Sequence, residues 1–300
     1  MLVHLNGQLI PRDQARIDPF DRGFIFGEGV YEGLRSIAWK DSTRVVGIER
    51  HIQRMRRGLE AAGIQFDVSD LGERSAELCR VNALRDAFVY WQVTGGTPGA
   101  PDPVRSRARG KNTHPTIFGY CSPQPALESQ REPATKRAIT RRDIRWELGW
   151  LKSISLMGNV MLAAEADRAG CEEAILIRGG DERGRAGLIA EGLATNVLLA
   201  LPDDKGGTEL ATPALESVSI LAGVTRDILL ALVPAIRQRP IRAEELDRTS
   251  EIMLLGTTTM VTSITELDGR RVGDGTPGPE AQRLLKILLH ALQTGSDREP

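Results

Sequence analysis

Cysteine, aromatic residues and long apolar runs are all scarce in this 300-residue sequence. Its three cysteines, Cys79, Cys121 and Cys171, are odd in number and widely spaced, and no CxxC pair occurs. This usage gives no basis for a disulfide framework and is typical of a reducing compartment, so we expect a cytoplasmic protein. No apolar run reaches the roughly 18 residues of a membrane helix. The N-terminal segment also lacks the basic and apolar regions of a signal peptide. We therefore predict neither a membrane span nor a secretory leader.

An excess of charge of either sign is also lacking. The 39 lysine and arginine residues are balanced by 40 aspartate and glutamate residues, which gives a formal net charge of −1. Without a basic excess, the sequence gives no reason to expect a nucleic-acid partner. The four histidines are scattered without the spacing of metal ligands, so no metal site is predicted. The remaining composition, 41% hydrophobic and 26% charged, is typical of a soluble globular chain.

Common nucleotide-binding and nucleophile motifs are absent as well. No G-x-G-x-x-G follows a predicted strand, and neither G-x-x-x-x-G-K-[ST] nor G-x-S-x-G occurs. The glycine-rich run GGTPG at residues 95–99 lacks the lysine and the helix that a phosphate-binding loop needs. We interpret it as a flexible loop.

The first part of the chain carries clear signals for strands and helices. Residues 1–10 contain an Asn-Gly turn between apolar residues, which predicts a hairpin. Apolar residues at helical spacing predict a helix over residues 49–63, ending at a glycine, and a second helix is predicted around residues 70–86. The run DAFVYWQVTGG predicts a strand because it is rich in β-branched and aromatic residues. Residues 95–113, rich in glycine, proline and arginine, predict a long surface loop.

A proline-, serine- and glutamine-rich stretch at residues 121–130 predicts a linker between two domains, residues 1–120 and 131–300. The second domain mixes strand and helix patterns and closes with an amphipathic helix over PGPEAQRLLKILLHALQTG. Because strands and helices are mixed without regular βαβ alternation, we predict an α+β fold for both domains.

Lys152 is the residue most suggestive of chemistry. It lies in GWLKSISLMGN, an apolar neighbourhood where a lysine either extends its ammonium to water or reacts. Only six of the 39 basic residues are lysines, so a position that keeps lysine in an arginine-rich chain suggests an amine that can lose its proton. A neutral amine can form a Schiff base, which a guanidinium cannot. On these residues alone, a surface role and a catalytic role remain equally open.

The segment around Lys152, LKSISLMGNVMLAAEADRAGCEEAILI, resembles the central segment of the class IV aminotransferases, which are pyridoxal 5′-phosphate (PLP) enzymes of fold type IV. Five further segments resemble this family in the same order: DRGFIFGEGVYEGLR (21–35), HIQRMRRGLEAAGI (51–64), AEGLATNVLLA (190–200), TPALESVSILAGVTR (212–226) and LLGTTTMVTSITELDGRRVG (254–273). The resemblance spans nearly the whole chain and implies the two-domain α+β fold of that family.

The resemblance implies a role for each matched residue. Lys152 corresponds to the Schiff-base lysine, which also carries the proton of the substrate α-carbon. Glu191 stands where the family keeps a carboxylate against the pyridine nitrogen, and such a carboxylate makes the ring a strong electron sink. Leu221 corresponds to the apolar residue that packs on the ring. The phosphate contacts correspond to Arg54, to the start of a helix at Val224 and Thr225, and to Thr257.

The same resemblance gives mixed signals about the branch of the family. Branched-chain aminotransferases carry a tyrosine five residues after the lysine, whereas this chain has Met157, as expected of the D-amino-acid branch. Tyr31 also matches that branch, in which a tyrosine helps to bind the substrate carboxylate. Gly33 and Arg35 in VYEGLR, however, resemble the branched-chain pattern.

The D-amino-acid branch also uses an arginine and a histidine to clamp the substrate carboxylate. Ala100 and Asp102 stand at those positions here, so the clamp is missing. We expect Arg35 to replace it, because an α-carboxylate needs a cation or N–H donors. The other candidates are the basic residues of 105–111 and the backbone at Thr258 and Thr259.

Four activities remain open from the sequence. We expect first a D-amino-acid transaminase that passes its amino group to a 2-keto acid. The alternatives are an R-selective amine transaminase, a branched-chain L-amino-acid aminotransferase and an aminodeoxychorismate lyase. Because the family builds its site at a dimer interface, the resemblance also implies a homodimer.

Overall fold

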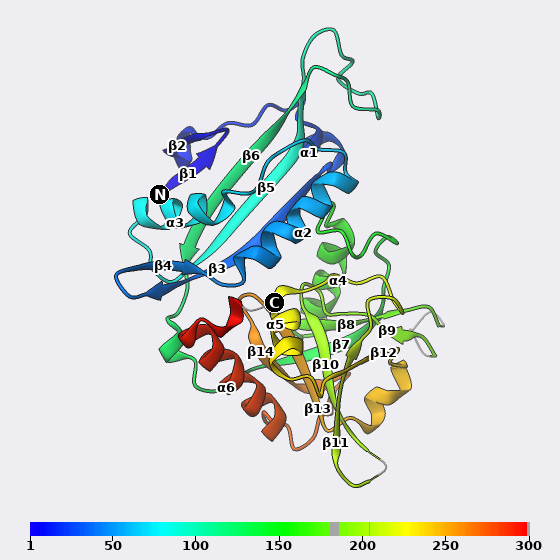
Figure 1. Ribbon diagram of the computed structural model, residues 1–300. Helices are drawn as coiled ribbons and strands as arrows, with labels where there is room; N and C mark the ends of the chain where they lie inside the picture. The colour runs from blue at the N-terminus through cyan, green and yellow to red at the C-terminus, as the bar shows by residue number, and fades with distance from the viewer. Residues whose placement is uncertain (181–185, 204, 299–300) are drawn as a thin grey trace. The chain divides into compact units, whose positions relative to one another are not determined.

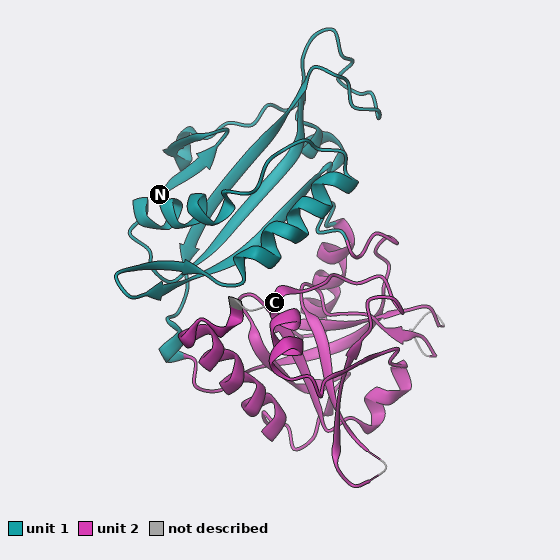
Figure 2. Ribbon diagram, in the orientation of Figure 1, with its two compact units in different colours: residues 1–129, 151–156 teal, residues 130–150, 157–300 magenta. Residues whose placement is uncertain are grey.

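The computed structural model describes residues 1–180, 186–203 and 205–298, shown from the N-terminus to the C-terminus in Figure 1. The chain divides into two compact units, coloured separately in Figure 2: unit 1 comprises residues 1–129 and 151–156, and unit 2 the remainder. Unit 1 extends to residue 129, so nearly all of the predicted linker 121–130 lies within it. Residues 151–156, with Lys152, also belong to unit 1 and not to the second domain predicted over residues 131–300.

Unit 1 is built on an antiparallel sheet of six strands in the order β2-β1-β6-β5-β3-β4. The strands are β1 (Leu2–Leu5), β2 (Gln8–Pro11), β3 (Gly29–Trp39), β4 (Ser42–Val45), β5 (Ala87–Pro98) and β6 (Thr113–Pro123). The predicted hairpin is confirmed: Asn6 and Gly7 connect β1 to β2 with φ angles of 49° and 87°, the positive values that a tight hairpin turn requires. The strand predicted in DAFVYWQVTGG is confirmed as β5.

The helices of unit 1 are α1 (Arg22–Phe26), α2 (Ile48–Ala61) and α3 (Leu71–Val81), with short 3₁₀ turns at Arg12–Gln14 and Leu127–Ser129. Helix α2 matches the helix predicted over residues 49–63. Its apolar stripe and that of α3 pack on one face of the sheet around the fully buried Trp91. The Trp91 indole donates a hydrogen bond to the Ser75 hydroxyl at 2.8 Å, so its polar atom is satisfied inside this core.

Two elements of unit 1 differ in length from the prediction. Helix α3 ends at Val81, because the Asn82 side chain turns back to donate to the carbonyls of Leu78 and Leu2, and Ala83 takes a positive φ of 55°. Strands β5 and β6 pair as far as Pro98 and Thr113, so the predicted loop 95–113 is shorter. Gly96 allows this pairing, since a Cβ there would lie 1.5 Å from the His114 carbonyl oxygen.

Unit 2 is built on a mixed sheet in the order β12-β11-β10-β13-β14-β7-β8-β9, with β15 paired to β14. Its strands are β7 (Ala134–Arg142), β8 (Glu173–Arg178), β9 (Leu188–Ile189), β10 (Asn196–Pro202), β11 (Thr208–Pro213), β12 (Arg237–Arg239), β13 (Glu251–Gly256), β14 (Met260–Leu267) and β15 (Arg270–Arg271). Several of these strands are buried along nearly their whole length, which is why they read as continuous apolar runs in the sequence.

The helices of unit 2 are α4 (Met157–Arg168), α5 (Val224–Leu232) and α6 (Pro279–Thr294), with a 3₁₀ helix η3 (Ala243–Arg248) and a shorter 3₁₀ turn at Ser296–Arg298. Helix α6 confirms the predicted closing amphipathic helix and buries its leucine stripe. Leu162 and Ala166 of α4 pack in a cluster with buried residues of β7 and β8. Mixed helices and sheets in both units agree with the predicted α+β class.

Candidate active site

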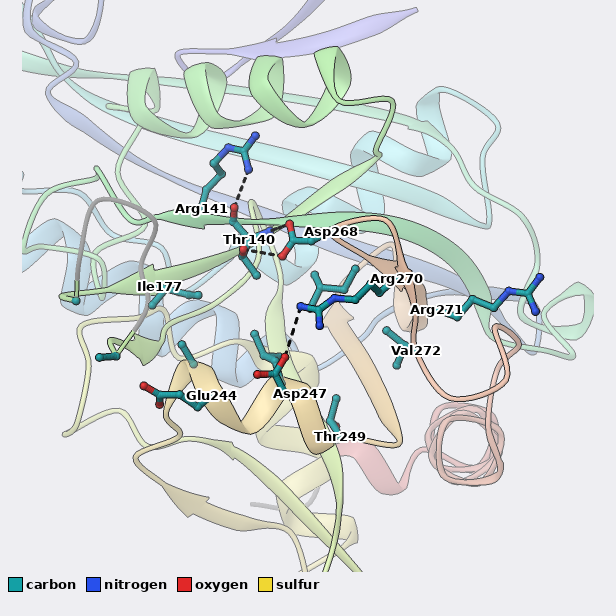
Figure 3. Close-up of a pocket in the computed structure, with 15 residues that line it drawn as sticks. Thr140, Arg141, Ile177, Glu244, Asp247, Thr249, Asp268, Arg270, Arg271 and Val272 are labelled. Carbon is teal, nitrogen blue, oxygen red and sulfur yellow. Dashed lines mark hydrogen bonds and ion pairs between the residues drawn. The ribbon is translucent and has the colours of Figure 1, made fainter.

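A cavity of about 1290 Å³ in unit 2 contains none of the residues predicted from the sequence. Its walls come from β7, η3 and the turn around β15, and they carry charges of both signs (Figure 3). Several of these charges already pair: Arg270 contacts Asp247 at 3.5 Å, and Asp268 accepts hydrogen bonds from Thr140. The residues predicted for the active site therefore lie outside this cavity.

Lys152 lies on a short segment that extends the edge of β3. The Tyr31 N–H donates to the Lys152 carbonyl at 3.0 Å, and the Ile154 N–H donates to the Gly29 carbonyl at 3.1 Å. These ladder bonds explain why residues 151–156 belong to unit 1. The Lys152 Nζ atom lies 4.3 Å from the centroid of the Tyr31 ring, so two predicted site residues are brought together by the backbone pairing.

Tyr31 is one end of a row of aromatic rings across the sheet. Its ring stacks on Tyr90 at 5.6 Å, and Tyr90 stacks on Tyr120 at 5.2 Å. The chain has only three tyrosines, and all three stand in this row. The Tyr31 ring thus contacts both the Lys152 ammonium and the Tyr90 ring.

Arg54 projects from α2 toward a buried carboxylate on β3. Its Nε and Nη2 atoms donate to the two oxygens of Glu32 at 2.8 and 2.6 Å, and the Nδ1 atom of His51 lies 2.7 Å from the same carboxylate. Burial opposes the ionisation of Glu32, but the charges and hydrogen bonds of Arg54 and His51 outweigh it and lower its pKa to about 2. Burial lowers the pKa of His51, which favours its neutral form.

The sequence interpretation missed Glu32 and His51. Signals for both exist: Glu32 is an acid inside a strand that is otherwise mostly buried, and His51 precedes Arg54 by three residues, which places both on one face of a helix.

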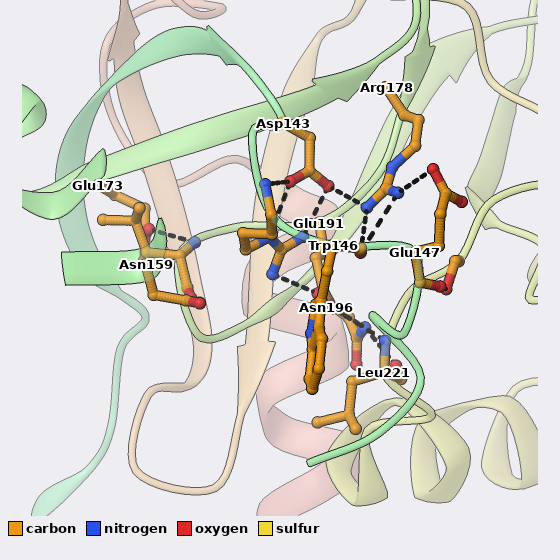
Figure 4. Close-up of polar contacts among 12 residues, drawn as sticks. Asp143, Trp146, Glu147, Asn159, Glu173, Arg178, Glu191, Asn196 and Leu221 are labelled. Atoms are coloured by element: carbon orange, nitrogen blue, oxygen red, sulfur yellow. Dashed lines mark hydrogen bonds and ion pairs between the residues drawn. The ribbon is translucent and has the colours of Figure 1, made fainter. Parts of the chain in front are cut away.

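Glu191 of unit 2 is 5% exposed and has three partners (Figure 4). It accepts hydrogen bonds from Arg145 Nη1 at 2.7 Å, from the Leu221 N–H at 3.2 Å and from the Asn196 amide at 3.4 Å. The Asn196 amide also donates to the Leu221 carbonyl at 2.9 Å. The structure thus brings the predicted ring-packing residue Leu221 beside the predicted pyridine carboxylate.

Arg145 divides its donors between two acids. Its Nε and Nη2 atoms bind Asp143 at 2.9 Å each, and Arg178 adds a further contact to Asp143 at 2.7 Å. Burial opposes ionisation of Asp143, but the hydrogen bonds of the two arginines outweigh it and hold its pKa below the usual value. Burial raises the pKa of Glu191, and its single contact with Arg145 only partly offsets that effect. A buried carboxylate in this state gains from a further cation.

Helix α5 begins at Val224 and Thr225 after Gly223, and no side chain in the described part of the chain caps it. Its first N–H groups are therefore available to an anion, which the helix dipole also favours. Gly223 is required here, because a Cβ would lie 1.9 Å from the side-chain oxygen of Asn196.

Thr257, Thr258 and Thr259 form the turn between β13 and β14. The buried hydroxyls of Thr259 and Thr195 find no hydrogen-bond partner within residues 1–180, 186–203 and 205–298. Both threonines lie beside Gly256, where a Cβ would be 2.5 Å from the Thr259 hydroxyl oxygen. Buried hydroxyls without partners, an uncapped helix start and a buried carboxylate short of cations together fit a cofactor with a phosphate and a protonated ring nitrogen.

Arg35 is buried, whereas an arginine that clamps a substrate carboxylate is expected to reach the substrate. It is 1% exposed, and its Nη2 atom donates to the Pro125 carbonyl at 2.6 Å. Its Nε and Nη1 atoms find no partner in the described part of the chain, and burial lowers its pKa. It stands four residues from Tyr31, which along a strand is about 13 Å.

The hairpin loop of residues 99–112 is tied back to unit 1. Glu28 forms ion pairs with Arg22 and Arg109, and Arg22 also donates to the carbonyls of Ser106 and Arg107. In the same loop, the Asp102 carboxylate accepts the N–H of Asn112 at 2.8 Å, so this residue fixes the loop.

Neither a metal cluster nor a membrane helix was found in the parts of the chain that the structure describes. No group of three or more histidine, cysteine, aspartate or glutamate residues there could hold a metal ion. No helix among these residues is both long and apolar enough to cross a membrane.

Comparisons with known proteins agree with this architecture. A family model described as amino-transferase class IV matches residues 29–267. The D-alanine aminotransferase of Bacillus licheniformis is 31% identical over 298 residues, which cover 97% of each chain. A putative branched-chain-amino-acid aminotransferase of Methanocaldococcus jannaschii is 29% identical over 295 residues, covering 95% of this chain and 94% of that protein.

Solved structures agree in fold. The branched-chain aminotransferase of Thermoproteus uzoniensis, with norvaline, superposes with a TM-score of 0.81 at 23% identity, covering 98% of this chain and 95% of that one. A T.th. branched-chain amino acid aminotransferase, complexed with N-(5′-phosphopyridoxyl)-L-glutamate, gives a TM-score of 0.82 at 23% identity, covering 100% and 95%. The resemblance, fold type and cofactor predicted from the sequence are confirmed: this chain belongs to the class IV aminotransferases, PLP-dependent enzymes of fold type IV.

Proposed function

We propose that this aminotransferase moves an amino group from a D-amino acid to a 2-keto acid, with Lys152 as its catalytic residue. The observation that carries the proposal is the position of the Lys152 ammonium, 4.3 Å above the ring of Tyr31, the tyrosine expected of the D-amino-acid branch. The D-alanine aminotransferase of Bacillus licheniformis, 31% identical over nearly its full length, supports the same choice.

In this proposal each predicted residue has a defined task. Lys152 would hold the cofactor covalently and, when released from it, its amine would carry the proton of the substrate α-carbon. When bound, PLP supplies an electron sink for the substrate's α-carbon. Glu191 would keep the ring nitrogen protonated, and Leu221 would pack against the ring. The positive charge of the ring nitrogen would supply the further cation that favours ionised Glu191.

The phosphate of the cofactor would be held by the remaining predicted residues. Val224 and Thr225 offer the N–H groups of an uncapped helix start. Thr257 belongs to the same turn as Thr259, whose buried hydroxyl finds no hydrogen-bond partner among the described residues. Arg54 adds a cation whose orientation is fixed by Glu32.

Tyr31 and Arg35 are the first proposed donors to the α-carboxylate of the amino acid. Tyr31 is close to Lys152 and can donate its hydroxyl. Arg35 remains our replacement for the missing clamp, because two of its buried nitrogens lack partners in the described residues and would be satisfied by an anion. The N–H groups of Thr258 and Thr259, and the cations of residues 105–111, are the other proposed donors.

A second candidate is a branched-chain L-amino-acid aminotransferase. It is supported by the relative from Methanocaldococcus jannaschii, 29% identical over 295 residues, and by Gly33 and Arg35 in β3. Met157, in place of the tyrosine of that branch, favours the first candidate instead.

The half-reaction with single amino donors tests the proposal. The PLP-loaded protein is mixed separately with D-alanine, L-leucine and (R)-1-phenylethylamine, and conversion of the bound cofactor to its amine form is followed by absorbance. We expect conversion with D-alanine; faster conversion with L-leucine or with the amine would reject D-specificity. Lys152→Ala should abolish conversion and the absorption of lysine-bound cofactor, whereas Lys136→Ala, a lysine paired with Glu173, should not.

We also propose that the protein acts as a cytoplasmic homodimer. Exposed apolar side chains gather on two segments of unit 2, and we name them the apolar face: Ile144, Trp146, Leu148, Trp150, Met157, Val160 and Met161. The two segments adjoin, since a Cβ on Gly158 would lie 3.1 Å from the side chain of Arg145. So many exposed large apolar residues favour a covering partner, and a second copy would cover them.

A further inference from the structure

Glu32 is the most deeply buried carboxylate beside the proposed cofactor residues of unit 1. Its side chain is 0% exposed, and every hydrogen bond found for that side chain in the described residues runs to α2. Arg54 binds both carboxylate oxygens in a fork, and His51 holds one of them. An isolated buried carboxylate would be costly, so these three side chains act as one unit.

We propose that Glu32 is a positioning residue for the cofactor phosphate, holding the guanidinium of Arg54 in the orientation that the phosphate requires, with His51 bracing the carboxylate. This inference rests on the proposed role of Arg54 as a phosphate ligand. It assigns Glu32 and His51 a task in cofactor binding that they exert through Arg54.

The bidentate contact with Glu32 fixes the guanidinium of Arg54. An arginine side chain loses rotamer entropy when it is fixed, and a bidentate carboxylate fixes it before the cofactor arrives. With Nε and Nη2 bound to Glu32 at 2.8 and 2.6 Å, the plane of the guanidinium is fixed, and its remaining N–H groups lie on the opposite edge of that plane. A phosphate then meets a preorganised donor.

Strand β3 carries two adjacent residues that orient different side chains. Tyr31 and Glu32 are consecutive residues of β3, so their side chains lie on opposite faces. Tyr31 contacts Lys152, and Glu32 contacts Arg54. One dipeptide therefore orients the amine that binds the aldehyde end of PLP and the cation proposed for its phosphate end.

The charges of Glu32, His51 and Arg54 also bear on the inference. Burial favours neutral His51, so Glu32 and Arg54 form a nearly neutral pair. An arginine whose charge is already balanced attracts a phosphate less strongly at long range. Its contribution to phosphate binding is therefore the correct orientation of its N–H donors. Glu32 therefore contributes through geometry, and shortening its side chain should be harmful even when its charge is kept.

The test compares two ligands that differ only in the phosphate. Dissociation constants of PLP and of pyridoxal are measured by fluorescence quenching for the wild-type protein, Glu32→Gln and Glu32→Asp. We expect PLP binding to weaken about tenfold or more in both variants, while pyridoxal binding stays within about twofold. The matched control is Glu28→Gln, because Glu28 also pairs with two arginines of unit 1 but contacts neither Arg54 nor His51. This control should bind both ligands like the wild type.

Two further variants separate this inference from the role of Arg54. Arg54→Met should weaken PLP but not pyridoxal; equal effects on both would reject the phosphate assignment itself. In the Arg54→Met background, Glu32→Asp should cause no further loss of PLP affinity, because Glu32 acts through Arg54. The inference is wrong, and the phosphate assignment of Arg54 stands, if Arg54→Met weakens PLP binding selectively but Glu32→Asp does not. Glu32→Asp would fail in this way if it left PLP binding unchanged or if it weakened the binding of both ligands equally. Circular dichroism confirms that each variant is folded, and Glu32→Asp decides the question if Glu32→Gln does not fold.

Discussion

At the scale of single residues, two buried glutamates show how partners decide the state of a carboxylate. Both oxygens of Glu32 accept hydrogen bonds from α2, and its pKa falls to about 2. Burial raises the pKa of Glu191, because Arg145 gives most of its donors to Asp143, whose negative charge also opposes ionisation. The carboxylate of Glu32 thus already has its cation, whereas the raised pKa of Glu191 would be lowered by a further cationic group.

Glu32 should make the stability of unit 1 depend on acid pH. Its folded pKa of about 2 lies below the ordinary value of 4.5, so the stabilisation is complete above pH 4.5 and is lost as the pH falls toward 2. The full loss should be on the order of 3 kcal/mol. Urea unfolding at pH 5 and pH 2.5 measures the larger part of it, because Glu32 is still partly ionised in the folded protein at pH 2.5. Glu32→Gln should show a smaller drop between these two values, and an identical drop would contradict the pairing.

Arg35 tests carboxylate recognition at the same scale. If it binds the donor carboxylate, Arg35→Ala should raise the KM for D-alanine about tenfold or more, since a charge-assisted pair is lost. The KM for (R)-1-phenylethylamine, which has no carboxylate, serves as the internal control. An unchanged KM for D-alanine would leave Arg35 only its observed contact with the Pro125 carbonyl.

At the scale of elements, the start of α5 is the most constrained junction of the candidate site. Gly223 packs so closely on Asn196 that a methyl group has no room, and Asn196 in turn holds Leu221 and Glu191. A single backbone position therefore controls both the helix N-terminus and the carboxylate.

Gly223→Ala should weaken PLP binding by about tenfold or more, because Asn196 must move and release its contacts. Equilibrium dialysis with PLP measures the loss. Gly72→Ala in α3 is the control, since its Cβ would meet only the flexible side chain of Ile48 at 3.1 Å. Equal affinities for the two variants would show that the α5 start does not bind the cofactor.

At the scale of the whole molecule, the exposed apolar face bears on the oligomeric state of the protein. Met157, Val160 and Met161 are 71%, 61% and 50% exposed, although the apolar pattern around Lys152 suggested a buried neighbourhood. Apolar side chains at such exposure in consecutive segments are typical of a surface that a partner covers.

Met157→Glu should shift the protein toward monomer and lower its transaminase activity, because a charge would be buried in the dimer contact. Analytical ultracentrifugation measures the change. Leu215→Glu is the matched control, because Leu215 is also a large exposed apolar residue of unit 2 but lies outside the apolar face. A wild-type protein that sediments as a monomer would contradict the proposal.

The sequence alone determined the family, the α+β class, the cofactor and the candidate residues Lys152, Glu191 and Arg54. It could do so because each signal is local: a motif, a helix start or a strand pattern lies within one short segment. Only the tertiary structure decided how those residues are held. The ties of Arg54 to Glu32 and of Arg145 to Glu191 join separate elements, and the Lys152 segment belongs to unit 1 because of backbone bonds to β3. Such contacts depend on which strands and helices meet in space, and no sequence period encodes them.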